Sequence, residues 1–420
     1  MVKKNFIGII GLGYVGLPLA VAMSAHYDVI GYDTDLDRIM ELKAGYDRNT
    51  EVSASDITAA SNLGFSPDIT QLDKCNIYIV TVPTPVDEND QPDLSPLISA
   101  TKQVCEVLSK GDLIIYESTV YPTTTREVCG SIITQETGLK MSETFFLGYS
   151  PERLSPGDPL HSVENITKLI AGCCEGSLNQ VKEIYEAILP NNTYQVKSLE
   201  EAEAAKILEN TQRDVNIALV NQFAKVMNKL GIDTCSVIEA ASTKWNFSKY
   251  TPGLVGGHCI GVDPYYLIHK ASQINVSTDL IEKARSVNAS MAYYCADLLI
   301  DRIIQRKLNK HVLILGGTFK ENCSDTRNSQ VPKIISRLFD QGLRIDIYDP
   351  YFSKSNATNF LSANLIDQLV PASYGGILLA VPHKEFINLG PDNIRKLSTT
   401  EHIFYDLKSI FSQEQSDLRL

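Results

Sequence analysis

The chain has 420 residues, which is more than one hydrophobic core usually supports, so two or three domains are expected. A hydrophobic fraction of 44% and a charged fraction of 21% are ordinary for a soluble globular protein. The net charge of -12 argues against nucleic acid or an anionic membrane as a partner. It does not exclude an anionic substrate, because a local pocket of Lys and Arg can override the global sign.

The nine cysteines show neither paired metal-ligand spacing nor the density of a disulfide scaffold. We therefore expect free thiols, no metal site and a cytoplasmic location. The sequence contains no signal-peptide pattern and no apolar run of about 18 residues or more, so no membrane insertion is expected.

The first part of the chain alternates predicted strands and helices. Phe6–Ile10 is typical of a buried strand, Leu17–Met23 of a helix, and Tyr27–Asp33 of a second strand. Further buried strands are predicted at Asn76–Val82 and Asp112–Glu117. This alternation predicts a doubly wound parallel sheet, whose ligands bind beyond the carboxyl ends of the strands.

The pattern becomes helical in the middle of the chain. Glu200–Leu230 lacks Gly and Pro and predicts one long helix, and Leu280–Gln305 predicts a second. We interpret these helices as a connecting domain and as the surface of a homodimer or higher homo-oligomer.

A second series of strands follows. His311–Gly317 starts it, and the later strands are predicted at Leu343–Pro350, Gly376–Pro382 and His402–Asp406. The predicted fold class is therefore α/β, with two Rossmann-like doubly wound domains joined by a central helical domain. The predicted boundaries are 1–197, 198–305 and 306–420.

A glycine motif follows the first strand. In Gly11-Leu12-Gly13-Tyr14-Val15-Gly16, Gly11 permits a tight turn, Gly13 lets the backbone approach a pyrophosphate, and Gly16 lets the helix pack on the strand. Asp33 ends the second strand, where a carboxylate accepts a hydrogen bond from the ribose 2′-hydroxyl and repels a 2′-phosphate. The motif therefore predicts a site for NAD rather than NADP.

A second glycine start, Gly316-Gly317, lacks the complete motif. It is either a structural turn or a nucleotide-diphosphate site that uses Lys320 and Arg327.

One thiol stands apart from the others. Cys259 lies among three glycines in the segment 254–264, with His258 before it and Asp263 four residues later. Glycines allow a close approach of the backbone, which a substrate-accessible cysteine requires and a buried one does not. A dinucleotide site together with a nucleophilic thiol predicts oxidation through a covalent intermediate.

Partners for this thiol are sought on the long helix and after the strands. Lys206 and Asn210 are four residues apart and share a helix face. Such a pair usually marks a solvated face, but Ala204 and Ala205 predict close packing here. Glu152 follows the apolar run Phe145–Gly148, which places a carboxylate beyond a strand end.

Seven motifs together resemble the UDP-glucose/GDP-mannose dehydrogenase family of nucleotide-sugar 6-dehydrogenases. They are G-L-G-Y-V-G-L-P-L-A, V-P-T-P, E-S-T-V, Y-S-P-E-R-L-S-P-G-D, E-A-A-K-I-L-E-N-T, G-G-H-C-I-G-V-D-P-Y-Y-L and F-K-E-N-C-S-D-T-R. They run through the whole chain in family order. The S-P-E-R and G-G-H-C-I-G-V-D-P-Y-Y-L forms resemble the branch acting on UDP-N-acetylhexosamines, which serves bacterial capsule and O-antigen synthesis.

The resemblance implies a four-electron oxidation of a sugar C6 alcohol to a carboxylate with two NAD. The family's nucleophile falls on Cys259, its oxyanion-stabilising lysine on Lys206 with Asn210 beside it, and its acid/base carboxylates on Glu152 and Asp263. Thr119 would hold the water and border the nicotinamide. The remaining NAD contacts fall on Gly11, Gly13, Tyr14, Val15, Gly16, Asp33, Arg38, Thr84 and Arg327.

The implied substrate is a UDP-N-acetylhexosamine, with UDP-N-acetylglucosamine favoured over UDP-N-acetylgalactosamine. Its predicted contacts are Glu152, Arg153, Leu154, Lys206, Asn210, Tyr250, Gly253, Gly256, Phe319 and Lys320. UDP-N-acetylmannosamine and UDP-glucose are alternatives, although Pro156 stands where the glucose branch carries an acidic residue.

Two other functions compete with this one. A two-electron β-hydroxyacid dehydrogenase would share the fold plan and a helix lysine, but it needs neither a nucleophilic cysteine nor a third domain. A redox sensor that binds NAD would not need Lys206, Asn210 and Glu152 together. The number of NADH formed per sugar separates the three: two, one or none.

Overall fold

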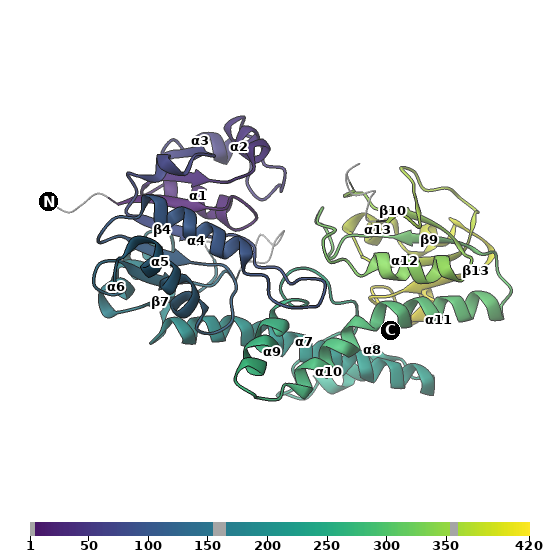
Figure 1. Ribbon diagram of the computed structural model, residues 1–420. Coiled ribbons are helices and arrows are strands. Elements are labelled where there is room, and N and C mark those ends of the chain that lie inside the picture. The colour runs from purple at the N-terminus through teal and green to yellow at the C-terminus, as the bar shows by residue number, and fades with distance from the viewer. Residues whose placement is uncertain (1–4, 154–164, 353–359) are drawn as a thin grey trace. The chain divides into compact units, whose positions relative to one another are not determined.

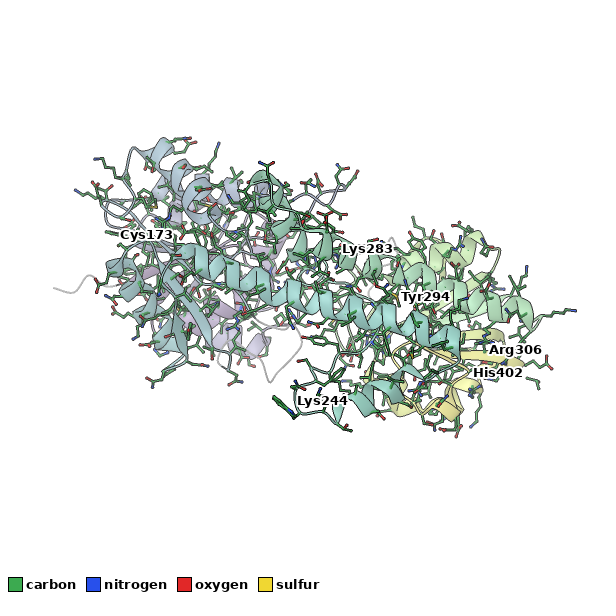
Figure 2. All side chains as sticks on the ribbon, turned by 90° about the horizontal axis from the view of Figure 1, so that it is seen from below. Cys173, Lys244, Lys283, Tyr294, Arg306 and His402 are labelled. Carbon is green, nitrogen blue, oxygen red and sulfur yellow. The ribbon has the colours of Figure 1, made fainter. Side chains whose placement is uncertain are left out.

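The computed structural model describes residues 5–153, 165–352 and 360–420, which form two compact units (Figure 1). One unit holds the chain up to Glu209 together with Tyr265–Val276, and the other holds Asn210–Pro264 and Ser277–Leu420. Helix α7 (Leu199–Leu230) starts in the first unit and ends in the second, and Figure 2 shows it as one uninterrupted helix. The helix predicted at Glu200–Leu230 is thus confirmed, whereas the finer division into three domains remains a prediction.

The first unit contains a sheet in the order β3-β2-β1-β4-β5-β6-β7-β8, counted over the described residues. Its first six strands pair in parallel, in the order expected of a dinucleotide-binding fold. β7 pairs antiparallel with β6, so the last two strands run in the opposite direction. The strands are β1 Phe6–Ile10, β2 Asp28–Tyr32, β3 Leu63–Ser66, β4 Ile77–Val80, β5 Leu113–Tyr116, β6 Phe146–Tyr149, β7 Lys168–Gly172 and β8 Thr193–Gln195.

Helices cover both faces of this sheet, as the uninterrupted apolar runs in β4 and β5 predict. One core lies under α1, α2, α3 and α6, and the other lies under α4, α5 and the start of α7. The helix bounds are α1 Gly16–Ser24, α2 Leu36–Lys43, α3 Ala54–Ala59, α4 Ser95–Val107, α5 Gly130–Thr137, α6 Glu175–Ile188 and α9 Asp263–Gln273.

The second unit contains a parallel sheet in the order β11-β10-β9-β12-β13-β14, again within the described residues. This order repeats that of the first six strands in the other unit. Helices α11 and α12 cover one face, and α13 and α14 cover the other. The strands are β9 His311–Leu315, β10 Arg344–Tyr348, β11 Asn364–Leu365, β12 Tyr374–Leu379, β13 Ser398–Asp406 and β14 Leu418–Arg419. The predicted fold class, with two Rossmann-like sheets and helices between them in sequence, is confirmed.

The helices of the second unit differ from the prediction at one place. The single helix predicted at Leu280–Gln305 is two helices, α10 (Asp279–Ala289) and α11 (Met291–Gln305). Ser290 separates them, and its hydroxyl donates to the Val287 carbonyl at 2.7 Å, a local bond that bends helices. The others are α8 Thr234–Ser242, α12 Val331–Asp340, α13 Lys384–Leu389 and α14 Pro391–Arg395.

None of the helices in the described ranges combines the length and the apolar character needed to cross a membrane.

Candidate active site

The three glycines of the loop after β1 have different structural tasks. Gly11 has a φ of +92°, which a side chain would strain. A Cβ atom at Gly16 would lie 1.8 Å from the Gly11 carbonyl oxygen and 2.5 Å from Oγ1 of Thr81, so α1 begins in direct contact with the loop. A Cβ at Gly13 would meet no atom within 4 Å. Gly13 therefore borders the open space into which a ligand can come.

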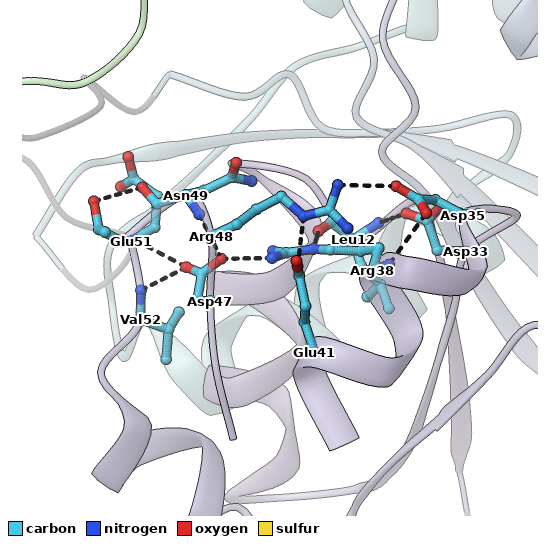
Figure 3. A network of polar contacts seen from close by, with 11 residues as sticks. Leu12, Asp33, Asp35, Arg38, Glu41, Asp47, Arg48, Asn49, Glu51 and Val52 are labelled. Carbon is cyan, nitrogen blue, oxygen red and sulfur yellow. Dashed lines mark hydrogen bonds and ion pairs between the residues drawn. The ribbon is translucent and has the colours of Figure 1, made fainter. Parts of the chain in front are cut away.

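A polar network holds this loop against the end of β2 (Figure 3). The carboxylate of Asp33 accepts from the backbone N–H of Leu12 at 2.8 Å and from that of Asp35 at 3.0 Å. Nε of Arg38 donates to the Leu12 carbonyl at 2.9 Å, and its guanidinium lies 2.7 Å from Asp47. Both sides of the Leu12 peptide group are thus fixed by side chains of neighbouring elements.

This geometry fits a dinucleotide. The N-terminal end of α1 carries a partial positive charge, and Asp33 lies past the carboxyl end of β2, beside the point where the strand order reverses. Asp33 is partly exposed and can accept from a ribose hydroxyl, whereas Arg38 is 4% exposed and holds the loop from the protein side. Tyr14, Val15 and Thr84 are partly exposed near the same strand ends, and their contacts with NAD remain predictions.

A second group of predicted residues meets beyond β6, in the first unit. The Lys206 ammonium donates to the backbone carbonyl of Glu152 at 2.5 Å, and Lys206 is 6% exposed. The Glu152 side chain is 15% exposed. The structure therefore brings Glu152 and Lys206 together, and Thr119 lies half-buried after the neighbouring strand β5.

The prediction that Ala204 and Ala205 pack closely beside Lys206 is wrong. Ala204 is exposed and Ala205 is only partly buried, so the alanines do not mark close packing. Burial of Lys206 instead follows from its bond to Glu152. Arg153 lies beside it, but its guanidinium pairs with Glu209 at 2.7 Å.

The Cys259 loop belongs to the second unit, and its glycines have a packing reason. A Cβ at Gly256 would lie 2.8 Å from the carbonyl oxygen of Asn328, and one at Gly257 would lie 2.8 Å from the Phe319 ring. Gly257 also has a φ of +77°. These two glycines let the loop pack on the segment after β9, so substrate access is not needed to explain them. Cys259 itself is partly exposed.

The Cys259 loop leads directly into a helix. The Cys259 carbonyl accepts from the backbone N–H of Asp263 at 2.9 Å, at the start of α9. The Asp263 carboxylate accepts from the amide of Asn210, and Asn210 in turn accepts from Arg213. Asn210 and Asp263 are 1% and 2% exposed. Asn210 and Asp263, which were each predicted as site residues, are therefore in contact.

An ion pair supports the same loop from α10. Arg285 lies 2.5 Å from the Asp214 carboxylate and donates to the carbonyl of Ile260 at 3.3 Å. Burial raises the pKa of Asp214, and Arg285 opposes this shift. Asp214 on α7 thus holds the arginine that supports the residue after Cys259.

Residues predicted to contact the nucleotide sugar lie in the second unit as well. Gly253 exchanges two hydrogen bonds with the side chain of Asn221, at 2.8 and 3.0 Å. The Tyr250 hydroxyl contacts Gln212, and the exposed guanidinium of Arg327 pairs with Asp325 at 2.8 Å. Phe319 packs on Gly257 as described above, and Lys320 follows it. Predicted positions Leu154 and Pro156 lie outside the described residues.

Three domains of one protein family match successive segments of the chain. The NAD binding domain of the UDP-glucose/GDP-mannose dehydrogenase family matches residues 5–189, its central domain residues 200–290, and its UDP binding domain residues 313–413. The chain belongs to the UDP-glucose/GDP-mannose dehydrogenase family. It is an NAD-dependent oxidoreductase, so NAD is confirmed as the cofactor, whereas the residues assigned to its binding remain predictions.

Individual relatives are similar to this dehydrogenase over its full length. The UDP-N-acetyl-D-glucosamine 6-dehydrogenase of Pseudomonas aeruginosa is 46% identical over 421 residues, which is 100% of each chain. The enzyme of the same name from Salmonella typhi is 44% identical and covers 99% of this chain and 98% of its own. Among solved structures, the UDP-D-ManNAc dehydrogenase of Pyrococcus horikoshii has a TM-score of 0.88 at 31% identity, and the match covers 97% and 96% of the two chains.

The sequence analysis of this dehydrogenase missed the charged groups behind Glu152. Lys168 opens β7 and Glu117 follows β5, and their side chains are 3% and 0% exposed. Each lies at the end of an apolar run, which is the signal that could have drawn attention to them. Lys168 and Glu117 are 51 residues apart in sequence, so no local sequence pattern indicates that they form a pair.

Proposed function

We propose that this dehydrogenase oxidises the C6 alcohol of UDP-N-acetylglucosamine to the uronic acid, with two NAD consumed per sugar. The observation that carries this proposal is the 46% identity, end to end, with the Pseudomonas aeruginosa enzyme of that name. A product of this kind suits the synthesis of surface polysaccharides, and cytoplasmic location is part of the proposal.

NAD is held by the glycine loop and Asp33, and when bound it supplies the hydride acceptor for both oxidations. The other tasks belong to side chains of this protein. Loss of a hydride from C6 and of the hydroxyl proton to water gives an aldehyde. The Cys259 thiolate adds to this aldehyde and retains it as the anion of a thiohemiacetal, so that the aldehyde does not escape. Loss of the second hydride from this adduct leaves a thioester on Cys259.

Hydrolysis of that thioester returns the thiol. Glu152 takes a proton from water, the hydroxide adds to the thioester carbon, and the carbon–sulfur bond breaks to release the carboxylate. The Lys206 ammonium and the Asn210 amide stabilise the negative oxygen that develops in this step. Asp263, which accepts from Asn210, keeps that amide oriented.

The proposal includes a homodimer. Leu219, Phe223, Val226 and Leu230 are exposed on α7 by 66%, 37%, 50% and 63%, and their spacing of four, three and four residues puts them on one helix face. A second copy of the chain would remove this stripe from water. Replacing Leu219 and Val226 by Glu should convert a dimer to a monomer in light-scattering measurements.

The activity is tested by counting products. Purified protein with UDP-N-acetylglucosamine and NAD should give two NADH per uronic acid, with the acid identified by mass spectrometry. Cys259→Ser should abolish acid formation, whereas Cys235→Ser, at another partly exposed free cysteine in α8, should leave it unchanged. One NADH per sugar, or normal turnover by Cys259→Ser, would contradict the proposal.

UDP-N-acetylmannosamine is the second candidate substrate. The Pyrococcus horikoshii structure, which is of a UDP-D-ManNAc dehydrogenase, favours it, but at 31% identity rather than 46%. The same assay with both sugars separates the two candidates.

A further inference from the structure

Three charged side chains and a tyrosine form a buried cluster in the first unit, which we call the Lys168 cluster: Glu117, Glu152, Lys168 and Tyr185. The Lys168 ammonium lies 2.6 Å from a Glu117 carboxylate oxygen and 3.3 Å from one of Glu152. The Tyr185 hydroxyl donates to the other oxygen of Glu117, and its ring faces the Lys168 ammonium at 5.3 Å. β5, β6, β7 and α6 supply these groups or end beside them.

Two carboxylates share one ammonium in this cluster. Burial raises the pKa of Glu117 to about 7, with Lys168 opposing the shift and Glu152 adding to it. Burial acts to lower the pKa of Lys168, but the two carboxylates outweigh it, so that the pKa is raised. Lys168 therefore stays charged, and Glu117 competes with Glu152 for it over the pH range in which Glu117 is ionised.

The members differ in their access to solvent. The side chains of Glu117 and Lys168 are 0% and 3% exposed, whereas that of Glu152 is 15% exposed. Glu152 is thus the member through which the cluster meets a ligand or water. The Glu152 backbone carbonyl accepts from Lys206. Its carboxylate accepts from the backbone N–H of Arg153 on one oxygen and from Lys168 on the other.

We propose that Lys168 is a positioning residue for the Glu152 carboxylate. We further propose that Glu117 weakens the electrostatic stabilisation of ionised Glu152 by pairing with the same ammonium. This rests on the proposed function, in which Glu152 must be ionised to take a proton from water. A cation within about 4–6 Å favours the ionised form of a carboxylate. Glu117 lies nearer to Lys168 and competes for it.

Other charges around Glu152 are already engaged. The Arg153 guanidinium pairs with Glu209 on α7 and donates to the Thr167 carbonyl. The Lys206 ammonium donates to the Glu152 carbonyl rather than to its carboxylate. Tyr185, from α6, donates to Glu117. The Lys168 ammonium, by contrast, contacts the Glu152 carboxylate directly, at 3.3 Å.

The competition predicts opposite effects from two substitutions. Lys168→Met removes the ammonium that both carboxylates contact, so the acidic limb of the kcat profile should move to higher pH by roughly one unit or more. Glu117→Gln is nearly isosteric and mimics the protonated carboxyl. It leaves the whole Lys168 charge to Glu152, so the acidic limb should move to lower pH.

The controls separate positioning from stability. Lys182→Met removes the exposed lysine that pairs with Glu186 on α6, and it should not move the limb. A purely structural Lys168 would lower activity equally at every pH in Lys168→Met and leave the limb of both variants in place. That result, or a shift of both variants in one direction, would overturn the proposal.

A second readout does not need turnover. Infrared difference spectra between each protein and its Glu152→Gln counterpart report the pH at which the Glu152 carboxylate is protonated in the free protein. This pH should be higher than wild type with Lys168→Met and lower with Glu117→Gln; an unchanged value in a folded variant would refute the inference. If wild type makes no uronic acid, the proposed function fails while this spectroscopic test still decides the role of Lys168.

Discussion

Asp33 and Asp349 occupy corresponding places in the two sheets, and Asp349 has a buried histidine against its carboxylate. Each carboxylate follows the second strand of its sheet and accepts from the backbone N–H of the glycine loop, Asp33 from Leu12 at 2.8 Å and Asp349 from Gly317 at 2.7 Å. Asp349 also lies 3.0 Å from Nε2 of His383, and both of these side chains are 0% exposed. Asp33 remains partly exposed.

This difference bears on the second glycine start. Because His383 covers Asp349, that carboxylate is not available to a ribose, whereas Asp33 is. The loop after β9 therefore shares the turn of a dinucleotide site without its recognition group. This segment matches the family's UDP binding domain. We propose that Lys320 and Arg327, rather than Asp349, contact the nucleotide there.

The glycine loop gives the first prediction. Gly13→Ala should leave the thermal unfolding temperature unchanged, since its Cβ meets no atom within 4 Å, but it should raise KM for NAD. Gly16→Ala should instead destabilise the fold by about 1–3 kcal/mol, because its Cβ would overlap the Gly11 carbonyl oxygen. Calorimetry and NAD titration of the two variants measure both effects. Equal loss of stability in both would contradict this division of tasks.

The second prediction concerns cofactor choice. Asp33→Ser should weaken NAD binding and reduce the preference over NADP, because the charge that repels a 2′-phosphate is lost. Ratios of kcat/KM for NAD and NADP measure the effect. Asp37→Asn removes the same charge from an exposed position on α2 and serves as the control. Equal wild-type efficiency with both cofactors would rule out this role for Asp33.

The sequence predicts the parts of this fold that depend on local patterns. Buried strands such as β4 and β5 are uniformly apolar, and α7 has a long run without Gly or Pro, so each is legible in one window. The reversal of β7 relative to β6 depends on pairing between distant segments, and no local pattern encodes it. The break at Ser290 depends on one hydroxyl bonding its own helix.

The same distinction holds for the site. Asp33 and Cys259 stand in sequence motifs whose spacing indicates a chemical role, so the sequence alone was enough to predict them as site residues. Lys168 and Glu117 were missed because a buried ion pair is defined by its partner, and the partner lies on another strand. The glycines beside Cys259 were assigned to substrate access, but packing on Phe319 and Asn328 accounts for two of them.

A third prediction concerns stability and pH. Glu203 on α7 accepts from the backbone N–H groups of Thr123 and Thr125, at 2.6 and 2.8 Å. Burial raises its pKa to about 7, although these N–H groups oppose the shift. A folded-state pKa above the unfolded value means that stability is present below about pH 4.5 and is lost as pH rises towards 7.

Glu203→Gln should remove this contribution. The difference in unfolding free energy between variant and wild type should therefore shift in favour of the variant by up to about 3 kcal/mol from pH 4.5 to 7. Urea unfolding at several pH values measures it. Glu201→Gln, at an exposed carboxylate in the same part of α7, should show a constant difference. A constant difference for Glu203→Gln as well would mean that Glu203 is ionised at pH 5.

The last prediction concerns the sugar. A 2-acetamido group is larger than a hydroxyl and carries both a donor and an acceptor. A site built to pair those groups leaves its own polar atoms unpaired when UDP-glucose binds, at a cost of roughly 1–3 kcal/mol per buried group. Because each ~1.4 kcal/mol is a factor of ten, UDP-N-acetylglucosamine should exceed UDP-glucose in kcat/KM by about tenfold or more. A panel with UDP-N-acetylgalactosamine and UDP-N-acetylmannosamine, read as NADH formation under one set of conditions, ranks the epimers at C4 and C2. The UDP moiety is common to all four, so differences within the panel arise from the hexose. If UDP-glucose were the best of the four, the substrate assignment would fall while the chemistry assigned to Cys259 would stand.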